Sequence, residues 1–171
     1  MNLVEVILKE HSKRQTEKIV RYVAHQPDRF AELVKVYLNG PYRVTQRAAW
    51  PLSICVEKHP TLIKPHLKAI VTFCEKPGVH DAVKRNTMRL LQYVKIPKSL
   101  MGKVADLAFG YLSSPAEPIA VKVFAMTVLT HLAEEFPELK NELIPLIEKQ
   151  MPYGSAGFRS RGMKLLKILK G

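Results

Sequence analysis

The sequence predicts an all-α fold of about four stacked helical hairpins and a terminal capping helix. Proline recurs at intervals of 33, 37 and 40 residues, a spacing typical of arrays of helical hairpins. Apolar residues follow most of these prolines at offsets of three, seven and ten, which trace one helical face. The segments before the prolines also align, at offsets of 38, 38 and 37 residues. The recurring prolines are Pro27, Pro60, Pro97 and Pro137, and the aligned positions are Thr45, Val83, Val121 and Phe158.

The chain is expected to open with a short lead-in helix at residues 2–11 that covers the first hairpin. Ser12, followed by Gln15 three residues later, matches a capping box, so the next helix should begin near Lys13. The first hairpin then occupies residues 12–40. Its corner lies at Pro27, because proline suits the first position of a helix and disfavours helical geometry in the residue before it.

Three further hairpins and a capping helix follow. Their expected bounds are about 41–78, 79–116 and 117–154, with the capping helix at 156–170. Pro65 and Pro145 lie inside second helices and should kink or shorten them. The first helix of the last hairpin is apolar almost all round and must be covered on most sides.

The only tryptophan, Trp50, is expected in the core rather than as a stacking platform. Its position within the first helix of its hairpin matches positions occupied by methionine in the later hairpins. These are Met88, Met126 and Met163.

The block from Val44 to Pro60, the inter-helix prolines and the basic residues that open several first helices resemble the HEAT-like helical-repeat family. The resemblance covers roughly residues 12–170, and it implies a right-handed α-solenoid in a single domain spanning 1–171. One distant branch with similar architecture, the DNA alkylation-repair helical-repeat glycosylases, is enzymatic. By resemblance, second helices would line the concave groove, and here that groove would be nearly neutral.

Composition and motifs point away from membrane and catalytic classes. The 171 residues contain no uninterrupted apolar run long enough to span a bilayer, and the N-terminus does not resemble a signal peptide. Cys55 and Cys74 are expected to be buried thiols, which favours a cytoplasmic location. The sequence shows no phosphate-binding glycine loop, zinc-protease motif or nucleophile elbow. We therefore expect no enzyme activity, no catalytic residue, no cofactor and no metal.

Charge is the strongest functional signal. Lys and Arg outnumber Asp and Glu by 27 to 15, which gives a net charge of +12. The expected first-helix segments hold 17 of the basic and 6 of the acidic residues, whereas the second-helix segments hold 9 and 7. Such a basic row is typical of proteins with anionic partners, although a solvated outer surface gives the same pattern. The candidate phosphate contacts are Arg14, Lys18, Arg21, Arg47, Lys84, Arg85, Arg89, Lys122, Arg159, Arg161 and Lys164.

We predict a non-enzymatic binding module, a HEAT-like scaffold that binds a protein partner along its helical surface. The alternative is sequence-tolerant nucleic-acid binding through the basic row, with contacts directed at the phosphate backbone. A glycosylase-type enzyme is a third hypothesis. It would require exposed aromatic side chains beside a carboxylate, and the sequence does not indicate such a setting. The partner's identity and the oligomeric state are left open.

Overall fold

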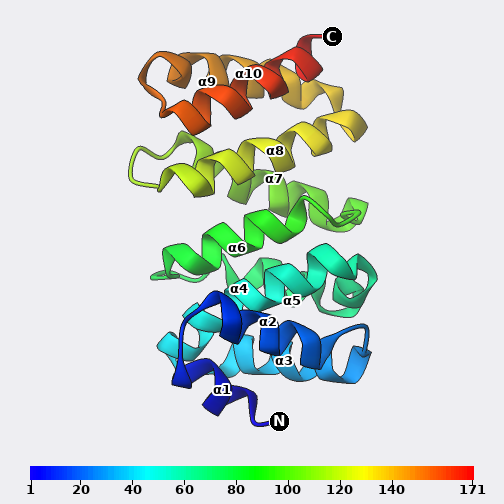
Figure 1. Ribbon diagram of the computed structural model, residues 1–171. Coiled ribbons are helices and arrows are strands. Elements are labelled where there is room, and N and C mark those ends of the chain that lie inside the picture. The colour runs from blue at the N-terminus through cyan, green and yellow to red at the C-terminus, as the bar shows by residue number, and fades with distance from the viewer. The chain divides into compact units, whose positions relative to one another are not determined.

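The computed structural model describes residues 1–171, and every regular element in it is helical. Ten α-helices alternate with short connections and three 3₁₀ helices, and no strand is present (Figure 1). The all-α prediction is confirmed. The chain divides into two compact units, an N-terminal unit of residues 1–95 and a C-terminal unit of residues 96–171. This division lies inside the expected third hairpin, and the handedness of the stack stays a prediction.

The N-terminal unit consists of successive helices joined at proline corners. Its elements are α1 (Leu3–Lys9), α2 (Lys13–Val23), α3 (Pro27–Asn39), α4 (Tyr42–Lys58), the 3₁₀ helix η1 (Pro60–His66), α5 (Leu67–Phe73) and α6 (Asp81–Leu91). Pro27 and Pro60 each begin an element, as their spacing predicts. Pro65 lies inside the 3₁₀ stretch η1, and α5 begins only at Leu67, because the missing N–H of a proline removes a helical hydrogen bond. The second helix of the hairpin at residues 41–78 is therefore shortened to α5, as expected.

Local capping at the start of α2 agrees with the sequence in one respect and differs in another. Ser12 Oγ accepts a hydrogen bond from the Gln15 backbone N–H at 3.1 Å, so α2 begins at Lys13. The Gln15 side chain does not complete the capping box. It donates to the Val6 carbonyl at 2.5 Å and thereby ties α2 to the preceding lead-in helix.

The core of the N-terminal unit lies along the faces that the periodicity predicts. Phe30, Leu33 and Tyr37 of α3 and Ile70 of α5 are 0–1% exposed. Side chains of α4 between Val44 and Val56 complete this core. Burial of apolar side chains is the main source of stability, at roughly 1.5–3 kcal/mol for each large side chain.

The C-terminal unit is built around one apolar helix. Its elements are α7 (Lys98–Ser113), α8 (Ile119–Glu135), η2 (Pro137–Leu139), α9 (Lys140–Gln150), η3 (Met151–Tyr153) and α10 (Ala156–Lys170). α8 packs against α7, α9 and α10, which explains why its sequence is apolar on nearly every side. α9 continues through Pro145 without a break, and α10 has the bounds expected of the capping helix.

The predicted methionine register is right for α6 and α8 and wrong for α10. Met88 and Met126 are fully buried, whereas Met163 is 62% exposed. α10 packs on α8 and α9 through Phe158, Gly162, Leu165 and Leu169, and this stripe turns Met163 away from both helices. The same position is buried only where further helices cover it.

Neither the hydropathy nor the length of any helix is sufficient for it to cross a lipid bilayer. Cys55 and Cys74 are buried, and no disulfide joins them. Burial raises the pKa of the Cys55 thiol to about 12.

Candidate binding surface

The candidate site lies between α2 and α4, which run side by side in the same direction. His11, just before α2, meets the edge of Trp50 with ring centroids 5.9 Å apart. His25, just after α2, meets His59, just after α4, at 6.4 Å. The ring contacts pair the start of α2 with the middle of α4 and the end of α2 with the end of α4, so the groove between the two helices has two distinct ends.

This α2–α4 groove encloses a cavity of 490 Å³ with an apolar floor and a charged rim. Val20, Trp50 and Ile54 form the floor, and Thr16 lies beside them. The rim residues are Lys13, Glu17, Arg21 and Lys58. The volume is within the range of pockets that hold ligands, roughly 300–1,000 Å³. The expectation that Trp50 belongs to the core is therefore only half met, because its indole is half-buried and borders this open groove.

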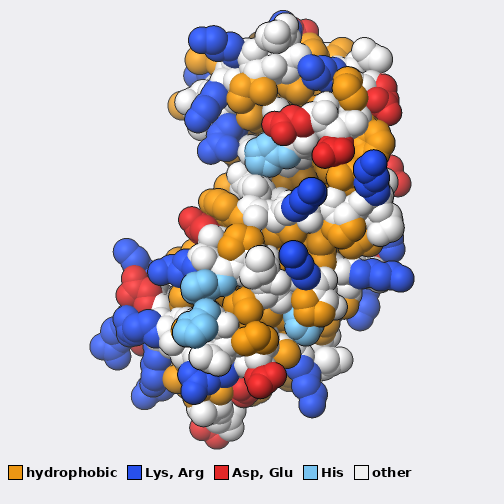
Figure 2. Space-filling model, turned by 90° about the vertical axis from the view of Figure 1, so that its right-hand side faces the viewer, with side chains coloured by type: hydrophobic (Ala, Val, Ile, Leu, Met, Phe, Trp, Pro, Cys, Tyr) orange, Lys and Arg blue, Asp and Glu red, His pale blue; other side chains and the backbone are white.

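Most of the positive charge at the groove is available to a partner. Arg21 and Lys58 are exposed and make no ion pair or side-chain hydrogen bond within the protein. Lys13 lies 3.9 Å from Glu17, but their side chains are 82% and 52% exposed, so this pair contributes little. Figure 2 shows Lys and Arg side chains gathered along the lower left edge of the view, on the N-terminal unit.

Positive charge continues from the Trp50 end of the groove towards α6. Burial, followed by the charges of Arg47 and Arg85, holds the pKa of His11 below its ordinary value of 6.5. Arg47 also donates to the Leu8 and Ile7 carbonyls at 3.0 and 3.4 Å, which satisfies two carbonyls at the end of α1. Arg47 therefore fastens the lead-in helix, while the Arg85 side chain is exposed and makes no hydrogen bond or ion pair.

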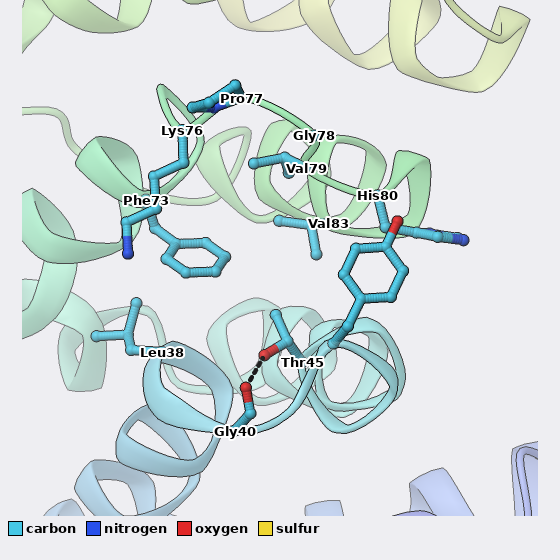
Figure 3. Close-up of a pocket in the computed structure, with 11 residues that line it drawn as sticks. Leu38, Gly40, Thr45, Phe73, Lys76, Pro77, Gly78, Val79, His80 and Val83 are labelled. Carbon is cyan, nitrogen blue, oxygen red and sulfur yellow. Dashed lines mark hydrogen bonds between the residues drawn. The ribbon is translucent and has the colours of Figure 1, made fainter.

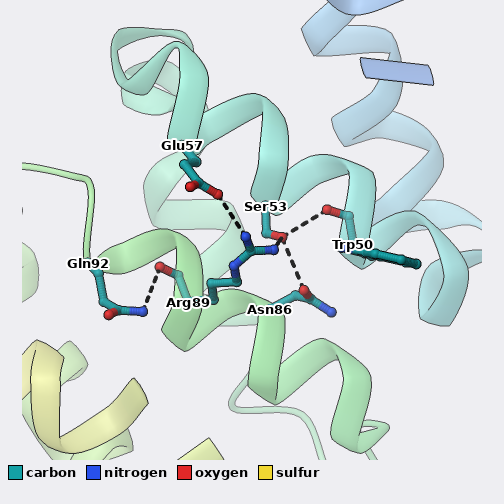
Figure 4. Close-up of polar contacts among 6 residues, drawn as sticks. All are labelled: Trp50, Ser53, Glu57, Asn86, Arg89 and Gln92. Carbon is teal, nitrogen blue, oxygen red and sulfur yellow. Dashed lines mark hydrogen bonds and ion pairs between the residues drawn. The ribbon is translucent and has the colours of Figure 1, made fainter. Parts of the chain in front are cut away.

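Arg89 is held by a polar cluster between α4 and α6 (Figure 4). Its guanidinium lies 2.8 Å from a Glu57 carboxylate oxygen and donates to Ser53 Oγ at 3.4 Å. Ser53 Oγ also lies 3.1 Å from Asn86 Oδ1, and the Asn86 amide donates to the Ala82 carbonyl at 2.8 Å. Arg89 thus joins two neighbouring first helices, and its charge is largely neutralised.

The remaining predicted residues are distributed over both units. Arg14 and Lys18 are exposed on α2, and Lys84 is half-buried on α6. In the C-terminal unit, Lys122 donates to Gln150 Oε1 at 3.1 Å and Arg161 donates to Thr127 Oγ1 at 3.2 Å. Arg159 and Lys164 are exposed on α10, and their side chains make no hydrogen bond or ion pair. Seven of the eleven predicted residues lie in the N-terminal unit, and among these only Arg21 lines the groove.

A second pocket opens where α3 and α5 end and α4 and α6 begin (Figure 3). It has a volume of 310 Å³, and Leu38, Phe73 and Val79 supply apolar lining. Lys76 lies over the Phe73 ring at 4.8 Å, and Tyr42 meets His80 edge-on at 5.8 Å. The Lys76 ammonium group of this second pocket is already engaged with the Phe73 ring, so the α2–α4 groove is the better candidate for an anionic partner.

Sequence reasoning did not identify seven of the groove residues, which are Lys13, Thr16, Glu17, Val20, Trp50, Ile54 and Lys58. A signal for them exists in the spacing. Positions 50, 54 and 58 are each four residues apart, and positions 13, 17 and 21 repeat the same interval. Each set therefore shares one helix face, although spacing alone does not tell which two faces meet.

The comparison with known proteins agrees with this architecture. No curated protein matches the chain. A family model described as a HEAT repeat domain matches residues 4–169, almost the whole length. The chain therefore belongs to the HEAT repeat domain family.

Proposed function

We propose that this protein is a non-enzymatic scaffold that binds a protein partner across the α2–α4 groove. HEAT repeat domains are helical scaffolds that typically mediate protein interactions. The observation that carries the proposal is the combination of an apolar floor with a basic rim whose charges are mostly unneutralised. Interfaces between proteins characteristically place apolar contacts at the centre and polar contacts at the edge.

The groove suits a polypeptide better than a nucleic-acid backbone. Phosphate contacts need only cations, whereas the three floor residues Val20, Trp50 and Ile54 offer apolar surface to side chains. Two of the arginines expected to contact phosphate, Arg47 and Arg89, are engaged in contacts that hold helices together. The exposed cations Arg14, Lys18 and Arg85 favour nucleic-acid binding as a second candidate function.

Features of the groove also support a non-enzymatic role. Base excision requires a flipped base to be stacked and read beside a catalytic group. The groove has one indole and one carboxylate, and the Glu17 side chain is 52% exposed and paired with Lys13.

The Cys55 thiol, with its pKa raised to about 12, supplies almost no thiolate at neutral pH. Two buried cysteines without a disulfide support the cytoplasmic location.

The test compares two double charge reversals. A partner captured by cross-linking is purified, and its affinity is measured for wild type, for Arg21→Glu/Lys58→Glu at the groove, and for Arg159→Glu/Lys164→Glu on α10. All four residues are exposed, and both variants change the net charge equally. We expect the groove variant to weaken binding tenfold or more and the α10 variant to weaken it less than threefold. Equal losses would contradict the proposal.

Fluorescence anisotropy with labelled duplex DNA, single-stranded DNA and RNA tests the second candidate. Phosphate-driven binding weakens steeply between about 50 and 200 mM salt. Under the proposed function, none of the three binds appreciably at the lower salt concentration. Tight binding that weakens steeply with salt and is lost in Arg21→Glu/Lys58→Glu would identify nucleic acid, and not a protein, as the partner.

A further inference from the structure

We propose that the occupant of the α2–α4 groove is an acidic protein segment carrying one apolar side chain between two carboxylates. The apolar side chain packs on Val20, Trp50 and Ile54, and the carboxylates meet the basic ends of the groove. This inference rests on the proposed function and specifies the chemistry of its partner.

The length of the groove favours a polypeptide segment. Lys13 and Arg21 are eight residues apart on α2, and Trp50 and Lys58 are eight residues apart on α4. Eight residues of α-helix span about 12 Å. The basic groups therefore stand at opposite ends of an elongated groove, whereas a compact anion would reach only one end.

The distribution of charge favours carboxylates at both ends. Lys13 lies at the end marked by Trp50, and Arg47 and Arg85 add positive potential nearby. Arg21 and Lys58 lie at the other end. Two carboxylates about 12 Å apart match this arrangement, for example those of residues four apart in an extended strand or seven to eight apart in a helix.

The middle of the groove selects an apolar side chain. Val20 and Ile54 are aliphatic, and Trp50 is half-buried with His11 at one edge, so this surface is incompletely covered in the free protein. Transfer of a leucine-sized side chain from water onto such a floor stabilises a complex by about tenfold or more. Glu17 is the one groove residue whose charge repels an acidic occupant, so reversal of that charge should strengthen binding.

Trp50 makes the test direct, because it is the only tryptophan and lies on the groove floor. The probe is a 12-residue peptide with one leucine flanked on each side by glutamates. Addition of this peptide should shift the Trp50 emission to shorter wavelength with a micromolar Kd. A matched peptide with glutamine in place of leucine should bind about tenfold more weakly.

Three exposed substitutions on α2 separate the groove from general electrostatics. Arg21→Glu should weaken the leucine peptide tenfold or more, and Glu17→Lys should tighten it severalfold. Lys18→Glu makes the same charge change as Arg21→Glu on the same helix outside the groove lining, and it should weaken binding less than threefold. Circular dichroism of each variant verifies that the helices are retained.

The proposal is overturned if acidic peptides leave the Trp50 emission unchanged, or if Lys18→Glu weakens them as much as Arg21→Glu. A thymidine oligonucleotide of equal charge that shifts Trp50 more strongly than the peptide would also overturn it, in favour of nucleic acid. A partner that loses affinity for Arg21→Glu/Lys58→Glu without moving the Trp50 emission would refute the inference while leaving the proposed function intact.

Discussion

Replacement of Arg89 by alanine should destabilise the protein, whereas the same replacement of Arg85, one helical turn away, should not. Arg89 pairs with Glu57 at 2.8 Å, and the two side chains are 24% and 36% exposed. The Arg85 side chain is exposed and makes no hydrogen bond or ion pair. The two arginines lie on the same helix, so they differ in partners and not in helical propensity.

The expected magnitude follows from this partial burial. A fully exposed ion pair contributes about 0.2–1 kcal/mol. A hydrogen bond to a charged group contributes about 1.5–3 kcal/mol when it is shielded from water. The half-buried Arg89–Glu57 pair lies between these limits, so Arg89→Ala should lower the free energy of unfolding by about 1–2 kcal/mol. Arg85→Ala should change it by no more than about 0.5 kcal/mol.

Urea denaturation followed by circular dichroism measures both changes, and a double-mutant cycle isolates the pair. Glu57→Gln removes the charge with little change of volume, and the coupling free energy between Arg89→Ala and Glu57→Gln should be about 1 kcal/mol. The reasoning is refuted if the coupling is near zero or if Arg85→Ala costs as much as Arg89→Ala. In that case, weaker ligand binding by an Arg89 variant would indicate loss of a direct contact between Arg89 and the ligand, and not damage to the helix packing.

Three further predictions concern single groups. Because burial raises the pKa of Cys55 to about 12, native protein at pH 8 should react with iodoacetamide there only as it unfolds, and rapid native labelling would contradict this. The pKa of His11 is lower in the folded protein than in the unfolded chain, so the unfolded chain binds protons better and stability should fall as the pH drops below about 6.5. Arg85→Gln should raise the pKa of His11 in an NMR titration, and it should make the loss of stability at low pH smaller. Gly102→Ala in α7 should raise the free energy of unfolding by about 0.5–1 kcal/mol, because the added Cβ meets nothing within 4 Å. Gly40→Ala should lower the free energy of unfolding, because its Cβ would lie 2.6 Å from the Val36 carbonyl oxygen. Thermal denaturation that ranks the two variants the other way would contradict this geometry.

Local signals in the sequence predict the helices well because they act within a few residues. Ser12 caps α2 through an N–H three residues away, and Pro60 begins η1 where the repeat places a corner. Pro145 shows the limit of the same reasoning, because α9 continues through it. A missing hydrogen bond weakens a helix, but the packing of Leu143 and Ile147 into the core holds this one together.

The candidate site was harder to predict because its parts meet only in three dimensions. Trp50 shares its register with two fully buried methionines, which correctly indicates the side of α4 that faces inward. Its actual exposure depends on α2, where Val20 and the short link at His11 leave part of the indole uncovered. No pattern within α4 contains that information.

Charge shows the same limit and also indicates how binding experiments should be designed. A sequence count treats Arg21, Arg47 and Arg89 as equal members of one basic row. The structure separates them, since the side chains of Arg47 and Arg89 are hydrogen-bonded to groups 39 and 32 residues away, whereas the Arg21 side chain makes no hydrogen bond or ion pair. Reversal of Arg47 or Arg89 would place a carboxylate against a carbonyl or against Glu57, and would damage the helix packing that forms the groove. Only exposed cations without partners can report on a bound ligand, and for that reason Arg21 and Lys18 are the informative pair.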